Sequence, residues 1–133
     1  MLEMQIHPRF QETDALGHIN NTVPAVWFES ARDPLFRVFT PDLDVRDWRL
    51  ILAGYTVQFK RELFYGEGVT LKTGVKRIGS SSFTVWQEAW QGGELAVTAE
   101  TTLIHFDYQS RKALPLTHEQ REGLGRWLLE ESE

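Results

Sequence analysis

The spacing of hydrophobic residues along the chain changes with position and predicts which elements form. Near the N-terminus, apolar and polar residues alternate, and the apolar positions are Met4, Ile6, Pro8 and Phe10. Alternation of this kind is typical of a short, half-buried strand. Because proline cannot donate a hydrogen bond to a sheet, Pro8 indicates that this strand lies at an edge or contains a bulge.

A helical spacing follows. Apolar residues recur every three or four positions at Val23, Val26, Trp27, Ala31, Leu35 and Val38. This pattern predicts a helix of about four turns that begins after Asn21 and ends near Phe39. Pro24 is compatible with the first turn, but Pro34 removes a hydrogen bond inside the helix, so we expect a kink or an early stop near Asp33.

The second half of the chain has the pattern of long strands separated by tight turns. The runs are Leu50–Leu63, Val69–Ile78, Ser82–Gln91 and Leu95–Asp107. Long strands joined by short glycine-containing turns predict an antiparallel sheet. In the third run, Trp86 and Trp90 share the face opposite to Phe83 and Val85, which indicates that both faces of this strand are covered.

The last element is a short helix near the C-terminus. Thr117 and Gln120 form a capping box, and Leu124, Trp127 and Leu128 provide an apolar side. A single central helix beside a large sheet buries its apolar stripe only if the sheet wraps around it. We therefore predict an α+β fold over residues 1–133, with one domain, one central helix and a short C-terminal helix.

The amino-acid composition excludes some kinds of chemistry and some kinds of partner. The chain has 133 residues, no cysteine, and 14 Lys and Arg against 19 Asp and Glu, for a formal charge of −5. The absence of cysteine excludes disulfides and thiolate chemistry, and the negative charge disfavours nucleic acid as a partner. No segment has the apolar length of a membrane span or the pattern of a signal peptide, so we expect a soluble, cytoplasmic protein without membrane partners.

Candidate chemistry concentrates between residues 12 and 29, where polar residues run directly into the predicted helix. Asp14 lies a few residues before the helix start, and the backbone N–H groups there can polarise a carbonyl. A carboxylate in this position can act as a general base or as a nucleophile on a thioester. The alternative is that Asp14 only supports the turn into the helix.

Two other side chains in this segment are open to a catalytic or a structural interpretation. Glu29 lies about two turns into the helix and is the alternative to Asp14 as the base, although many helical glutamates simply face solvent. His18 can bind a carboxylate or the substrate, but a single histidine in a turn is often structural.

The segment also resembles a known family. Thr13–Asn21, followed by Trp27–Glu29 and by Ala31 and Arg32, is similar to the motif at the start of the central helix in hotdog-fold acyl-CoA thioesterases of the 4-hydroxybenzoyl-CoA thioesterase type. The pattern of Phe59–Leu63 and of the strands after it is similar to the same family. The motif differs at Asn21, where many members carry histidine, and at Pro24, where tyrosine is usual.

The resemblance implies a hotdog fold, in which a long antiparallel sheet wraps around a central helix. It implies dimers formed by joining two sheets edge to edge, which often pair into tetramers, with active sites at the dimer interface. The thioester would lie at the N-terminus of the central helix, where the backbone N–H groups polarise its carbonyl, and a hydrophobic tunnel beside the helix would take the acyl group. Asp14 matches the acidic residue that attacks the thioester or activates water.

The remaining candidates are substrate-binding residues. Gly17, His18, Asn20 and Asn21 surround the predicted helix start, where the asparagines can also act as helix caps. The amide of Asn21 can orient water or a carbonyl but cannot transfer a proton at neutral pH.

Further candidates lie in the strand region. Lys60 and Arg61 can bind the phosphates of coenzyme A or can simply be charges on a solvated strand edge. Ser81 and Ser82 can contact the pantetheine arm, although such residues are also common in turns.

We predict hydrolysis of acyl-CoA thioesters to free acid and coenzyme A, with Asp14 as base or nucleophile. The alternative is a non-catalytic protein that binds or senses acyl-CoA in the same tunnel. The histidines show no spacing typical of a metal site, and we expect no cofactor other than the coenzyme A that forms part of the substrate.

Overall fold

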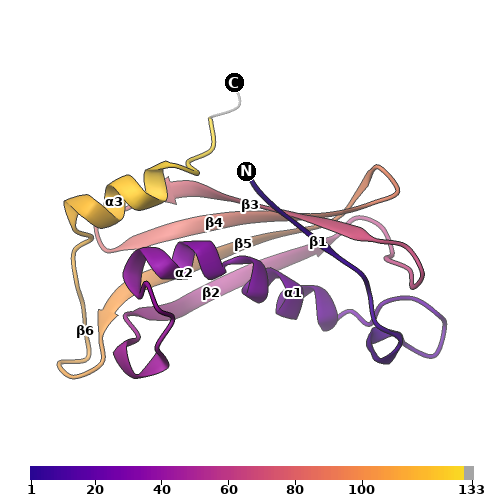
Figure 1. The fold of residues 1–133 in the computed structure, drawn as a ribbon, viewed down its shortest axis with the longest axis horizontal. Coiled ribbons are helices and arrows are strands. Elements are labelled where there is room, and N and C mark those ends of the chain that lie inside the picture. Colours follow the sequence, from indigo (N-terminus) through magenta and orange to yellow (C-terminus); the bar gives the residue numbers. More distant parts are fainter. Residues whose placement is uncertain (131–133) are drawn as a thin grey trace.

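The fold is one antiparallel sheet curled around two short helices. The computed structural model describes residues 1–130. The sheet has the order β1-β3-β4-β5-β2, and β6 pairs with the end of β5 (Figure 1). The strands are β1 (Leu2–Ile6), β2 (Leu50–Phe59), β3 (Val69–Ile78), β4 (Ser82–Gln91), β5 (Glu94–Asp107) and β6 (Lys112–Ala113). The helices are α1 (Val23–Ala31), α2 (Asp33–Phe39) and α3 (His118–Gly125), with single 3-10 turns at Phe10–Glu12 and Val45–Asp47.

The four long strands form where the alternation of residues predicts them. The clearest difference is at the end of β2, which stops at Phe59 rather than at Leu63. There the backbone N–H groups of Lys60 and Arg61 both donate to the carbonyl of Ala96, so the regular ladder with β5 ends. This change of direction carries the segment after β2 toward the loop that precedes α1.

The N-terminal strand is shorter than predicted. β1 pairs only with β3 and is an edge strand, as the proline indicates, but it ends at Ile6. Pro8 lies beyond the strand and Phe10 begins a 3-10 turn, so the prediction that they continue the strand is wrong. Phe10 is exposed and packs edge to face against Tyr65, with ring centroids 5.9 Å apart.

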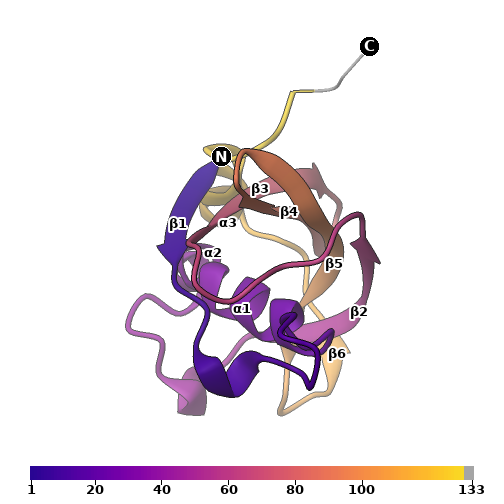
Figure 2. The same cartoon turned by 90° about the vertical axis from the view of Figure 1, so that its right-hand side faces the viewer.

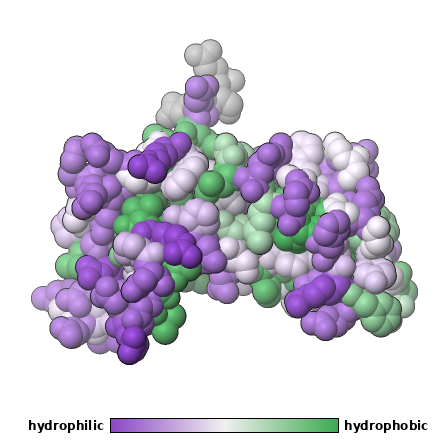
Figure 3. All heavy atoms as spheres, in the orientation of Figure 1, coloured by the Kyte–Doolittle hydropathy of each residue, from purple (hydrophilic) through white to green (hydrophobic). Residues whose placement is uncertain are grey.

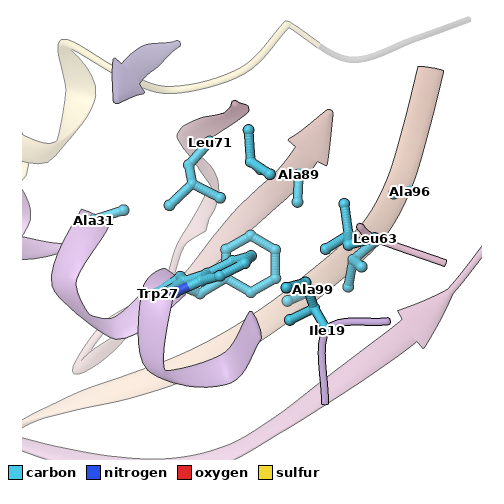
Figure 4. Packing of buried hydrophobic residues seen from close by; sticks show 11 residues of the cluster. Ile19, Trp27, Ala31, Leu63, Leu71, Ala89, Ala96 and Ala99 are labelled. Atoms are coloured by element: carbon cyan, nitrogen blue, oxygen red, sulfur yellow. The ribbon is translucent and has the colours of Figure 1, made fainter. Parts of the chain in front are cut away.

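The predicted break in the central helix is present. α1 ends at Ala31 and α2 begins at Asp33, with Pro34 in the first turn of α2. Seen end-on, the sheet curves around both helices (Figure 2). The indole of Trp27 on α1 lies among Ile19, Ala99 and other small apolar side chains beneath the sheet (Figure 4). A second cluster buries Leu35 and Phe39 of α2 against the other half of the sheet.

The start of the C-terminal helix and the outer face of the sheet agree with the sequence pattern, but α3 ends at Gly125, so Trp127 and Leu128 lie beyond the helix, and Leu128 is exposed. Thr117 and Gln120 form the predicted capping box, and Leu124 is fully buried where α3 packs on α2 and β3. Trp86 and Trp90 on the outer face are half-buried. Amines of β3 lie over their rings, and the Lys72 amine is 4.9 Å from the centroid of the Trp90 ring.

The arrangement confirms the predicted hotdog fold, with a long sheet wrapped around α1. β2 forms one edge of the sheet and differs from β3, β4 and β5 in being exposed along most of its length. Its exposed side chains include Leu52, Tyr55 and Phe59. Within residues 1–130, no helix combines the length and the apolar character needed to cross a membrane.

Candidate functional site

A cleft of about 540 Å³ lies where the loop before α1 meets the end of β2. We call it the Asp14 cleft. Its walls come from the loop and the start of α1, from the segment after β2, and from β5, and they are formed by Asp14, His18, Ile19, Asn20, Asn21, Pro24, Phe59, Lys60, Arg61, Glu62, Leu63 and Val97. The structure therefore brings together six of the predicted site residues, which are Asp14, His18, Asn20, Asn21, Lys60 and Arg61.

Asp14 is held in a tight turn. Its Oδ1 accepts hydrogen bonds from the backbone N–H of Leu16 at 2.8 Å and of His18 at 3.2 Å. Gly17 completes the turn with a φ of 84°, a left-handed conformation that side chains with a Cβ disfavour. The supporting role of Asp14 in the turn is therefore real. The carboxylate is nevertheless exposed to the cleft, and Oδ2 has no hydrogen-bond partner among residues 1–130.

The start of α1 has few free N–H groups. The N–H of Thr22 donates to the side-chain oxygen of Asn20 at 2.9 Å, and the N–H of Val23 donates to the Asn20 carbonyl at 3.0 Å. Pro24, at the second position of the helix, has no N–H. Neither the backbone N–H of Asn21 nor that of Ala25 has an acceptor among residues 1–130, and because Asn21 lines the cleft, its N–H is a donor that a ligand there can use.

A buried carboxylate behind the cleft fixes the loop to the helix. Glu12 is 7% exposed and accepts hydrogen bonds from the Trp27 indole at 2.8 Å and from the Arg9 backbone N–H at 2.7 Å. Burial by itself raises the pKa of Glu12, but the hydrogen bonds from Arg9 and Trp27 outweigh it and hold the pKa below its usual value. The Glu12 carbonyl also accepts the N–H of Asn20, so this residue positions the loop that carries Asp14.

His18 is directed toward the segment after β2 rather than toward Asp14. Its Nε2 lies 3.1 Å from a carboxylate oxygen of Glu62, and its ring packs edge to face on Phe64 at 5.1 Å between centroids. Backbone pairing supports the same contact, because His18 forms an isolated bridge with Phe64. His18 therefore closes one side of the cleft by binding the two loops to each other.

The two basic residues lie at the mouth of the cleft and are exposed. The amine of Lys60 lies 3.3 Å from the side-chain amide oxygen of Gln58. Arg61 makes an exposed ion pair with Glu94 at 3.0 Å. Ion pairs exposed to water contribute little to stability, so an incoming phosphate can replace Glu94 at small cost.

The structure does not bring the remaining predicted residues into the lining of the Asp14 cleft, and these are Gly17, Glu29, Ser81 and Ser82. Glu29 is exposed on α1 and lines two other hollows, one beside β2 and one beneath α2. Ser81 and Ser82 lie at the turn between β3 and β4, near α3 and at the opposite end of the sheet from the loop before α1 (Figure 1). The Ser81 carbonyl accepts the N–H of His105, which is a structural role.

Sequence reasoning missed two charged residues that matter here, Glu12 and Arg32. Both are 7% exposed. Arg32 had a detectable signal, because it follows Phe28 by four positions and precedes Leu35 by three and so occupies the apolar stripe of the helix. Glu12 had none, because its partner Trp27 is fifteen residues away. Within residues 1–130, no three His, Asp or Glu side chains are grouped as a metal ion would need.

The chain is similar to known proteins over nearly its whole length. The sequence model of the Thioesterase-like superfamily matches residues 8–127. The structure is similar to that of a predicted thioesterase from Bacillus stearothermophilus, with 34% sequence identity, a TM-score of 0.94 and 98% of each chain covered. It is also similar to a thioesterase from Thermus thermophilus complexed with coenzyme A and Zn, with 25% identity, a TM-score of 0.83, and 94% of this chain and 92% of that chain covered.

Among curated proteins, the uncharacterized protein YsmA of Bacillus subtilis (strain 168) is 26% identical over 121 residues, which are 90% of this chain and 82% of that protein. All the residues that line the Asp14 cleft lie inside the segment that the superfamily model matches.

Proposed function

Because the chain belongs to the Thioesterase-like superfamily, we propose that it hydrolyses acyl-CoA thioesters in the Asp14 cleft. The observation that carries this proposal is the placement of the Asp14 carboxylate in one cleft with the free N–H at the start of α1. An acyl transfer needs a nucleophile or base on one side of the carbonyl carbon and hydrogen-bond donors at its oxygen.

Asp14 supplies the first of these groups. Its Oδ1 is engaged by backbone N–H groups, which fixes the carboxylate, while Oδ2 is left for the chemistry. Oδ2 attacks the carbonyl carbon or removes a proton from an attacking water molecule. The bond between carbon and sulfur then breaks, and the coenzyme A thiolate leaves with little need for a proton. If Oδ2 is the nucleophile, water then hydrolyses the acyl–Asp14 anhydride, which releases the acid and restores the carboxylate.

Asn21 supplies the second group. As the carbonyl carbon becomes tetrahedral, its oxygen gains negative charge, which the free Asn21 N–H and the positive end of the α1 dipole stabilise. The side-chain amide of Asn21 is exposed at the same cleft and has no partner among residues 1–130, so it provides a further donor.

Lys60 and Arg61 fit the binding of coenzyme A. Both lie at the mouth of the Asp14 cleft, where the phosphates of the nucleotide would remain in solvent while the thioester enters. The Thermus thermophilus relative is a complex with coenzyme A, which is consistent with this use of the cleft.

We expect the chain to act as a dimer joined through β2. β2 leaves one edge of its backbone unpaired in the sheet and exposes Leu52, Tyr55 and Phe59. A long, exposed, apolar edge strand favours pairing with another strand, and a second copy of β2 can pair with it about a twofold axis. A dimer by light scattering that becomes a monomer on Leu52→Lys would support this arrangement, and a monomeric wild type would refute it.

Release of free thiol tests the proposed activity. Purified protein would be mixed with short, long and aromatic acyl-CoA substrates, and the liberated coenzyme A would be measured with a thiol reagent. We expect turnover of at least one class. If no substrate releases thiol but acyl-CoA raises the melting temperature, the protein is the non-catalytic binder that the same cleft also permits.

A further inference from the structure

Arg32 is a buried cation at the break between α1 and α2. Its side chain is 7% exposed and points toward the sheet, where one guanidinium nitrogen, Nη1, lies 3.2 Å from the amide oxygen of Gln87 and 3.5 Å from the hydroxyl of Thr101. Burial lowers the pKa of Arg32, because the charged form loses its hydration. A charge in such a place is costly unless an anion is bound to it.

The other edge of the guanidinium is free. Nε is buried and has no hydrogen-bond partner among residues 1–130, and Nη2 donates no hydrogen bond there either. Nε and Nη2 together form the edge that binds a carboxylate through two parallel hydrogen bonds, and because Nε is buried, a carboxylate reaches it only when the guanidinium turns toward the groove. Glu29, one turn earlier, is near enough to raise the pKa of Arg32, yet it forms no ion pair with it in the described part of the chain.

Arg32 lines two hollows, and one of them lies between α1 and the sheet on the side of the catalytic residues. We call it the Arg32 groove, and it has a volume of about 260 Å³ between α1, β2 and β5. Its apolar wall includes Ala25, Val26, Leu52, Val57 and Ala99. The surface of this side of the molecule mixes apolar and polar residues, and its lower edge is hollowed between two lobes (Figure 3).

The Arg32 groove lies next to the Asp14 cleft along α1, although no residue lines both. Asn21 and Pro24 line the cleft, while Thr22 and Ala25 of the same helical turn line the groove. From Thr22 to Arg32 the chain advances ten residues, or about 15 Å at the rise of a helix, which is roughly the length of an extended acyl chain of ten to twelve carbons. A chain whose thioester lies at Asn21 therefore ends near the guanidinium.

We propose that the Arg32 groove binds the acyl chain and that the free edge of Arg32 binds a carboxylate at its far end, so that the preferred substrates are medium-chain ω-carboxyacyl thioesters. This inference rests on the proposed thioesterase function, because it assigns the substrate class of the same site. Glu29 also lines the groove. Its negative charge repels the carboxylate, so it reduces the affinity that Arg32 provides.

A pair of substrates of equal length tests the inference. Coenzyme A thioesters of an α,ω-dicarboxylic acid and of the matching monocarboxylic acid differ only in the end group. We expect kcat/KM to be ten- to a hundredfold higher for the carboxyl-ended thioester, as charge-assisted hydrogen bonds to a carboxylate predict. Arg32→Met should remove most of this preference while changing the methyl-ended substrate little, and Glu29→Gln should increase it.

The control is Arg37→Met, which removes an exposed arginine of α2 that binds the Pro41 carbonyl and should leave the preference unchanged. An equal loss for both substrates in Arg32→Met, or a wild type that prefers the methyl end, would overturn the inference. The inference would also be overturned if Arg32→Met lost the dimer but kept the preference. The anion that binds Arg32 would then come from the second copy of the chain and not from the substrate.

The melting temperature of the wild type, measured with each thioester, gives a second test that does not depend on whether Arg32→Met folds. If neither thioester is hydrolysed but the carboxyl-ended one gives the larger increase in melting temperature, the proposed hydrolysis fails and the recognition by Arg32 stands. Equal increases for the two thioesters would refute the recognition.

Discussion

Glu12 allows a quantitative test of how the loop before α1 is held in place. Glu12→Gln keeps the size of the side chain and retains an oxygen that can accept from the Trp27 indole. Its NH₂ group, however, cannot accept the backbone N–H of Arg9, which now bonds to the carboxylate at 2.7 Å. Loss of this hydrogen bond to a charged group costs about 1.5 to 3 kcal/mol of unfolding free energy.

A double-mutant cycle with Trp27→Phe measures how much the negative charge of Glu12 strengthens the bond to the indole, because the amide oxygen in Glu12→Gln can still accept it. Trp27→Phe removes the N–H that lies 2.8 Å from the carboxylate, and we expect a coupling of about 1 kcal/mol between the two changes. Urea unfolding followed by far-ultraviolet circular dichroism gives the free energies for all four proteins. Additive effects, or a loss below about 0.5 kcal/mol in Glu12→Gln, would refute the idea that this carboxylate holds the loop.

The pH dependence gives an independent check on the same residue. The pKa of Glu12 is lower in the folded protein than in the unfolded chain, so its contribution to stability is fully present above the unfolded value of about 4.3. It is lost as the pH falls through the folded pKa. The stability difference between wild type and Glu12→Gln should therefore shrink in acid, and a difference that grows below about pH 4 would contradict the assignment.

Four further predictions concern three glycines and a helix cap. Gly17→Ala should lower the free energy of unfolding by about 1 kcal/mol, because the turn at Asp14 needs a positive φ; a melting curve equal to that of the wild type would refute this. Gly123→Ala should destabilise α3, because its Cβ would lie 2.9 Å from a methyl carbon of Val38. Gly125→Ala, which meets no atom within 4 Å, should stabilise by up to about 1 kcal/mol. Thr117→Ala should cost about 1 kcal/mol by removing the cap, measured by urea unfolding with Glu119→Ala as the control.

The elements that could be predicted from the sequence are those set by local residues. Alternation places β3 and β4 at their observed bounds, Pro34 locates the break between α1 and α2, and Thr117 marks the start of α3. Each of these features depends on neighbours within a few positions, which is the range over which periodicity and caps act. The end of β2 was missed because it depends on the pairing of Lys60 with Ala96 across the sheet.

The residues of the candidate site also divide into those that local sequence predicts and those that depend on long-range contacts. Asp14 and the asparagines lie close in sequence and remain close in the fold, whereas Lys60 reaches the Asp14 cleft only because β2 ends where it does. Glu29 and Ser81 are separated from the cleft by the direction of α1 and by the length of the sheet. Which carboxylates are buried, and which N–H groups remain free, depends on long-range contacts that spacing does not encode.

The carboxylate of Asp14 carries the central claim, and Asp14→Asn tests it with little change in structure. The amide oxygen of asparagine can still accept the N–H groups of Leu16 and His18, so the turn is retained while the nucleophile or base is lost. Asp42→Asn is the matched control, because Asp42 also accepts a backbone N–H two residues later, on the loop after α2.

The decisive measurement is kcat for thiol release from the best acyl-CoA substrate. The account predicts a fall of about a hundredfold or more in Asp14→Asn, with an unchanged melting temperature and with full activity in Asp42→Asn. An Asp14→Asn protein that is folded and hydrolyses the substrate at the wild-type rate would contradict it.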